Sequence, residues 1–80
     1  MIRALTELKS NESGTIREIR GGGALTRRLG ALGITPGRQI TKISSMSLRG
    51  PVTVQVNRSQ IALGFGMAST ILVDIDRKPQ

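Results

Sequence analysis

The sequence predicts a single, mainly β domain that curls into a small, partly open barrel and carries one short α-helix. Residues 52–56 and 71–75 alternate valine or isoleucine with another residue, as strands with one buried face do. Turn signals recur at short intervals, and only the stretch from Ala24 to Leu32 has helical spacing. Because no linker or internal repeat divides the 80 residues, we expect one domain over residues 1–80.

Two upstream strands are expected over residues 14–19 and 38–45, which are rich in β-branched residues. In each of them two isoleucines lie three residues apart, which breaks a period of two and predicts a bulge or a strand end. Bulges help a small sheet to curl and close, so they favour a barrel over a flat sheet.

A hairpin is expected where the strand over residues 52–56 is followed by a tight turn at Asn57 and a third short strand over residues 59–63. After it, Gly64 and Gly66 predict a sharp corner that leads directly into the last strand.

The helix is predicted because Leu25, Leu29 and Leu32 fall at positions i, i+4 and i+7, where they form one apolar stripe. Gly33 follows at the position where a helix cap favours a left-handed residue. Pro36 and Gly37 then occupy the central positions of a predicted type II turn.

The formal net charge is +7, and its excess lies in the middle of the chain, where residues 19–73 contain no acidic residue. The basic residues of this stretch are Arg20, Arg27, Arg28, Arg38, Lys42, Arg49 and Arg58. We therefore expect a partner with an acidic or phosphate-bearing surface.

The N-terminal ten residues carry charges at Arg3, Glu7 and Lys9 and have no apolar core of the kind that directs export. The longest apolar runs are far shorter than the roughly 18 to 20 residues that cross a bilayer. We expect a cytoplasmic protein that does not insert into the membrane.

Catalysis is not expected, because the chain lacks both His and Cys, the usual base and a common nucleophile. The five carboxylates lie in charge-balanced segments that would not raise a pKa for acid–base work. We predict no catalytic residue and no enzyme activity.

A metal site could use only Asp74 and Asp76, which share a strand face as two hard oxygen ligands. Two carboxylates alone bind weakly, and they are more simply interpreted as surface charge paired with Arg77 and Lys78. We therefore predict no cofactor. Weak Fe²⁺ binding by a regulatory domain stays open as an alternative, without His or Cys to support it.

A small nucleic-acid-binding barrel is a second alternative because of the basic centre. Single-strand binders stack bases on aromatic side chains, however, and Phe65 is the only aromatic residue here. The helix is also too short to read a duplex, so the sequence argues against nucleic acid as the partner.

Motifs spread over most of the chain resemble the FeoA family. They are Gly14-x-Ile16, Gly21-Gly22, Arg28-Leu29-x-x-Leu32-Gly33-Ile34-x-Pro36-Gly37, Gly50-Pro51-Val52 and Ile61-Ala62-Leu63-Gly64-x-Gly66-Met67-Ala68-x-x-Ile71-x-Val73. The resemblance implies an SH3-like barrel and a cytoplasmic protein that assists FeoB, the membrane ferrous-iron transporter with its own GTPase domain. It also implies that the partner, and not this chain, moves the iron.

The partner-binding surface is predicted in two parts. Charged side chains should orient the complex and raise its association rate, while apolar anchors should supply affinity. The charged candidates are Arg27, Arg28 and Arg38, and the candidates in or near two turns are Met46, Leu48, Arg49 and Phe65. An unpaired strand edge in an incomplete barrel could also join two copies as a homodimer.

Overall fold

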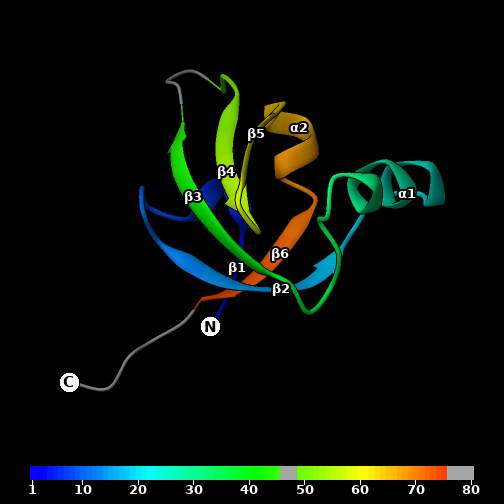
Figure 1. Cartoon of the computed structure of the whole chain (residues 1–80), viewed down its shortest axis with the longest axis horizontal. Coiled ribbons are helices and arrows are strands. Elements are labelled where there is room, and N and C mark those ends of the chain that lie inside the picture. Colours follow the sequence, from blue (N-terminus) through cyan, green and yellow to red (C-terminus); the bar gives the residue numbers. More distant parts are fainter. Residues whose placement is uncertain (46–48, 76–80) are drawn as a thin grey trace.

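The computed structural model describes residues 1–45 and 49–75, and this part of the chain forms one antiparallel sheet (Figure 1). Its strands lie in the order β1-β6-β2-β3-β4-β5, so β1 and β5 are the two edges. In chain order the elements are β1 (Ile2–Ala4), the 3₁₀ helix η1 (Leu5–Glu7), β2 (Ser13–Ile19), α1 (Gly23–Ala31), β3 (Gln39–Ser45), β4 (Val52–Val56), β5 (Ser59–Leu63), α2 (Phe65–Ala68) and β6 (Ile71–Ile75). The predicted mainly β, partly open fold with one short main helix is confirmed.

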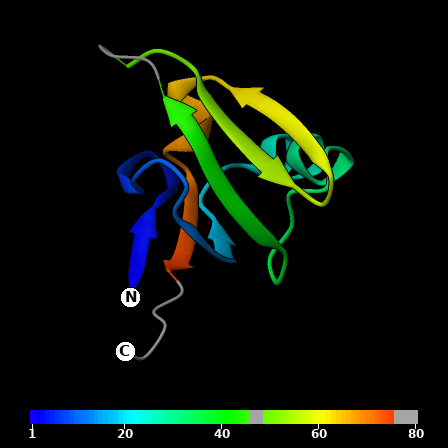
Figure 2. The same cartoon turned by 60° about the vertical axis from the view of Figure 1, so that its left-hand side comes forward.

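The sheet curls around a single apolar core (Figure 2). The alternation in β4 and β6 has the predicted outcome, because Val52, Val54 and Val56 of β4 and Ile71 and Val73 of β6 are all fully buried. The core also contains one leucine of α1, Leu29, and one leucine of η1, Leu5.

Of the two predicted alternatives, a bulge or a strand end, both upstream strands have a bulge. The register between β2 and β6 shifts between Ile16 and Glu18, and the register between β3 and β4 shifts between Lys42 and Ser44. An extra residue in one strand increases the local twist and bends it. These two shifts therefore lie in the long strands that carry the sheet around the core.

Helix α1 confirms most of the helix prediction but not its last leucine. Leu29 is fully buried and Leu25 is partly buried, whereas Leu32 is 42% exposed. The reason is that α1 ends at Ala31, and Gly33 has a left-handed φ of 86° that redirects the chain. Ile34 takes the buried position instead, with its N–H donating to the Leu29 carbonyl at 2.9 Å.

The turn after α1 has the predicted type II geometry. Gly37 has a φ of 94°, and the N–H of Arg38 donates to the carbonyl of Thr35 at 3.1 Å. A type II turn requires a positive φ at its third residue, which glycine adopts without strain.

The corner after β5 was predicted wrongly as a direct turn between strands. Residues Phe65–Ala68 form the short helix α2, which buries Ala68 in the core. Neither Gly64 nor Gly66 has a positive φ, and a Cβ on either would meet no atom within 4 Å. These glycines are therefore not required by backbone strain.

The charge pattern groups Lys42 with the basic surface residues, but the structure buries it. Its side chain extends from β3 to η1 and the residue after it, where Nζ donates to the carbonyl oxygens of Thr6 at 3.0 Å and Leu8 at 2.7 Å. The residue is only 4% exposed. Desolvation lowers the pKa of the Lys42 ammonium, and the negative charge of Glu12 partly opposes this shift.

Candidate functional site

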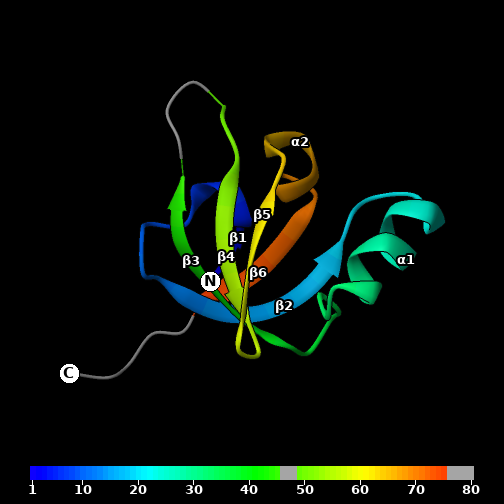
Figure 3. The same ribbon diagram turned by 45° about the horizontal axis from the view of Figure 1, so that its top comes forward.

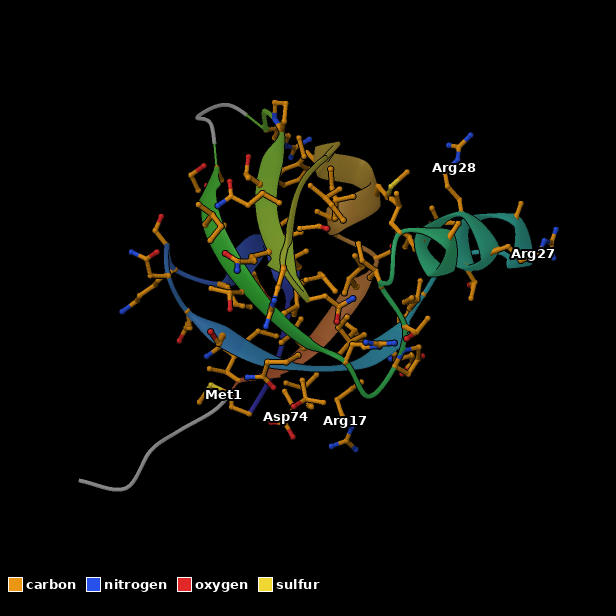
Figure 4. All side chains as sticks on the ribbon, viewed as in Figure 1. Met1, Arg17, Arg27, Arg28 and Asp74 are labelled. Carbon is orange, nitrogen blue, oxygen red and sulfur yellow. The ribbon has the colours of Figure 1, made fainter. Side chains whose placement is uncertain are left out.

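Helix α1 projects from one side of the barrel and carries two of the predicted partner-binding arginines (Figure 3). Arg27 and Arg28 are both exposed, and both point away from the sheet (Figure 4). The single helix residue with a fully buried side chain is Leu29, directly after them. The helix is thus anchored by Leu29 and Leu25, while its basic residues stay in solvent.

Arg38 lies directly before β3 and beside the turn that joins β4 to β5. Its Nη1 donates to Oδ1 of Asn57 at 2.8 Å. Asn57 has a φ of 59° and is followed in the turn by the exposed Arg58. The end of α1 approaches the same turn, because a Cβ on Gly33 would lie 3.2 Å from Nδ2 of Asn57. This end of the barrel therefore combines Arg38 with Arg58.

Arg49 and Phe65 form a second, separate contact. The guanidinium carbon of Arg49 lies 5.8 Å from the centroid of the Phe65 ring, within range of a cation–π interaction. Phe65 is half-buried and Arg49 is exposed. The predicted anchors Met46 and Leu48 lie outside the described residues.

The predicted residues therefore do not form one continuous cluster. The β4–β5 register pairs Val52 with Leu63 at one end of the hairpin and Val56 with Ser59 at the other. Arg49 and Phe65 flank the first end, whereas Arg38 and the turn flank the second, about 13 Å away for four strand steps. Arg38 and Arg58 lie at the β4–β5 turn, Arg49 lies near the start of β4 with Phe65, and Arg27 and Arg28 lie on α1.

Sequence reasoning missed Arg58 as a partner-binding candidate. The signal that could have found it is its place in a two-residue hairpin turn, where side chains are normally exposed. Within residues 1–45 and 49–75, none of Arg27, Arg28 or Arg58 forms a salt bridge with a carboxylate. Arg20, by contrast, pairs with Glu18 at 3.4 Å.

Asp74, one of the two candidate metal ligands, is engaged by cations of the chain itself. One carboxylate oxygen lies 2.8 Å from the N-terminal ammonium of Met1, and the other lies 3.2 Å from Nη1 of Arg17 (Figure 4). The hydrogen bond from the N-terminal ammonium lowers the pKa of Asp74, and the charges of the ammonium and of Arg17 act in the same direction. Among the described residues, the cations that pair with the Asp74 carboxylate are therefore the N-terminus of Met1 and Arg17.

The second candidate, Asp76, lies outside the described residues, as do Arg77 and Lys78. No group of three or more metal-ligating His, Cys, Asp or Glu residues occurs in the part of the chain that the structure describes. The same part contains no helix long and apolar enough to cross a membrane.

The family model for the FeoA domain matches residues 3–75, nearly the whole chain. This chain belongs to the FeoA family. FeoA domains are small accessory domains associated with ferrous iron transport, and the resemblance inferred from the sequence motifs is confirmed. No curated protein sequence is significantly similar to the chain.

Solved FeoA structures share the fold. An iron uptake regulatory protein, FeoA, is 29% identical with a TM-score of 0.87, and the match covers 94% of this chain and 99% of that one. FeoA of Stenotrophomonas maltophilia, solved in complex with zinc, is 27% identical with a TM-score of 0.75 and coverages of 92% and 89%. The latter is described as a prokaryotic SH3 domain protein and a candidate activating factor of bacterial ferrous iron transport. The fold of this FeoA domain is accordingly SH3-like.

The same fold occurs as part of larger proteins. A manganese-dependent transcriptional repressor superposes with a TM-score of 0.82 at 20% identity. The match covers 90% of this chain but only 40% of the repressor. At this identity the likeness concerns the fold alone, so it assigns no regulatory role to this FeoA domain.

Proposed function

We propose that this FeoA domain is a cytoplasmic accessory protein of ferrous iron uptake that binds a FeoB-type transporter through protein contacts and catalyses no reaction. The observation that carries the proposal is the exposed basic flank of α1, formed by Arg27 and Arg28, in a family associated with ferrous iron transport. Neither arginine has a carboxylate partner among the described residues. A net charge of +7 favours an acidic partner surface.

The arginines of α1 and the Arg49–Phe65 contact suit different parts of the binding process. Exposed, unpaired arginines at a rim raise the association rate and set the orientation of the complex. Phe65 is half-buried and lies beneath the guanidinium of Arg49, so it is a compact aromatic group of the kind that supplies affinity. Met46 and Leu48 stay proposed apolar contacts on the grounds of the sequence alone.

Iron is the partner's cargo in this proposal, and the domain holds no resident metal. Asp74 supports this assignment, because two cations already compensate its carboxylate and hold it in the charged, hydrogen-bonded state. A metal ion would have to displace an ammonium and a guanidinium to reach both oxygens.

The proposal is tested by reversing the charge of the α1 flank with Arg27→Glu and Arg28→Glu together. Both side chains are exposed and no described salt bridge involves them, so folding should be unchanged within about 0.5 kcal/mol. We expect the dissociation constant for the detergent-solubilised transporter to rise about tenfold or more, which corresponds to about 1.4 kcal/mol. Titration calorimetry measures the affinity, and thermal unfolding verifies the fold.

The matched control is Arg3→Glu with Lys9→Glu, which changes the net charge equally on exposed residues of the N-terminal segment. A loss of affinity in the control equal to that in the α1 variant would mean that only net charge matters. An unchanged affinity in the α1 variant would remove the α1 flank from the binding surface.

A further inference from the structure

Strand β5 ends the sheet with one long side unpaired. It pairs with β4 alone, and it forms the yellow outer strand in Figure 2. Because Val56 and Ser59 close a two-residue turn, they form a hydrogen-bonded pair. The alternation then directs the N–H and C=O groups of Gln60 and Ala62 outward, away from β4. No backbone hydrogen bond from these groups to another described segment is present.

This edge lacks the devices by which proteins normally block strand addition, which are charged side chains, proline, bulges and short length. The sequence of β5 is Ser-Gln-Ile-Ala-Leu, without a charge or a proline. Its register with β4 is regular through every pair from Val52↔Leu63 to Val56↔Ser59. Gln60 and Ala62 are both exposed.

The opposite edge is different. Strand β1 is only three residues long, and its central residue is Arg3. A short, charged edge is poorly suited to accept a further strand. The edge whose backbone N–H and C=O groups are best placed to accept a further strand is therefore β5.

Charge identifies the occupant of this edge. Arg58 lies in the turn before β5, and Arg49 lies over Phe65 just after it, so positive charge flanks both ends. Two copies joined antiparallel through β5 would bring Arg58 of one copy to the Arg49 end of the other. Such like-charge contacts oppose a second copy, whereas an acidic strand would be attracted at both ends.

We propose that an extended, acidic segment of the partner protein adds to β5 as a further strand of the sheet. The backbone groups of Gln60 and Ala62 supply the main-chain hydrogen bonds, and Arg49 and Arg58 select acidic residues at the two ends of the added strand. Strand addition gains affinity from the main chain and specificity from the side chains. The inference rests on the proposed function, since it describes how the FeoB-type transporter is held.

The test compares Ala62→Pro with Ala62→Thr. The Ala62 N–H faces outward, so proline removes a donor from the open edge without removing a β4–β5 hydrogen bond, and edge strands tolerate proline in that position. Threonine changes the side chain and keeps the donor. We expect Ala62→Pro to weaken binding of the solubilised transporter at least tenfold and Ala62→Thr to change it less than twofold, with thermal unfolding as the folding control.

Amide hydrogen exchange on the wild-type domain tests the same edge without a variant. We expect the amides of Gln60 and Ala62 to exchange rapidly in the free domain and at least tenfold more slowly with saturating transporter. Unchanged exchange, together with equal binding by the proline and threonine variants, would overturn the edge proposal while leaving the transporter as partner.

Two other outcomes would also be decisive. Slow exchange that depends on domain concentration without transporter would place a second copy on β5 and overturn the acidic occupant. Failure of the wild-type domain to bind the transporter at all would instead overturn the proposed function, and this inference with it.

Discussion

Replacing Gly14 with alanine is expected to lower the free energy of unfolding by about 3 kcal/mol, the upper part of the usual range for overpacking a core. Gly14 is a buried residue of β2 and pairs with Ile40 on one side and Ile75 on the other. A Cβ there would lie 2.5 Å from the carbonyl oxygen of Asp74 and 2.5 Å from Cγ1 of Val73. The Asp74 oxygen belongs to the backbone of β6, so relief requires the two strands to separate.

Urea and thermal unfolding measure this effect, and a domain of this size should lose roughly 4 to 8 °C of Tm for each kcal/mol. The matched control is Gly66→Ala, because Gly66 lies inside α2 and a Cβ there meets nothing within 4 Å. We expect the control to stabilise the domain by about 0.5 to 1 kcal/mol. If the Gly14→Ala variant were as stable as the wild type, the β2 and β6 backbones would have to lie farther apart at Gly14 than the structure shows.

Replacing Lys42 with methionine is the second change expected to have a large effect, a loss of about 1 to 3 kcal/mol. Methionine preserves most of the buried side-chain volume but removes the donor shared by the carbonyls of Thr6 and Leu8. Those two oxygens then lie at the β3–η1 contact without their partner, and η1 is held less firmly to the sheet. Lys9→Met, at an exposed lysine, should change stability by less than about 0.5 kcal/mol.

The pH dependence of the Lys42 effect has a defined sign. Burial lowers the pKa of Lys42 in the folded state, so between that pKa and the ordinary value of about 10.4 the unfolded chain binds more protons at this group. Stability therefore rises with pH in that window for the wild type relative to Lys42→Met. Urea unfolding of both proteins from about pH 8 to 10.5 measures this effect. We expect the stability difference between the wild type and Lys42→Met to grow toward alkaline pH. A stability difference that shrinks would contradict the burial of the ammonium.

Strands β4 and β6 could be predicted from the sequence because their alternation of apolar residues is unbroken. Such alternation indicates directly which side chains face the core. The sequence also predicted a bulge or a strand end in β2 and in β3, since two isoleucines three residues apart break the period of two. It did not predict β1 or α2, each of which is too short to show a period. Such elements form because tertiary contacts hold them, as the burial of Ala68 shows for α2.

The candidate site was only partly predictable for a related reason. Exposure of Arg27 and Arg28 follows from their place beside the leucine stripe of α1, but charge patterns alone do not distinguish an exposed cation from a buried one. Lys42 is therefore grouped with the surface arginines by its charge, although its ammonium donates to backbone carbonyls inside the fold. The open edge at β5 was not predictable either, because strand order depends on contacts far apart in the sequence.

The central claim, that this FeoA domain serves ferrous iron uptake by binding the transporter, is tested most directly by measuring uptake of radioactive Fe²⁺ in cells that lack the chain. We expect deletion to lower the initial uptake rate at an unchanged transporter level, and the wild-type chain to restore it. The Arg27→Glu, Arg28→Glu variant, present at the same level, should fail to restore it. An uptake rate that is the same with and without the chain would contradict the account.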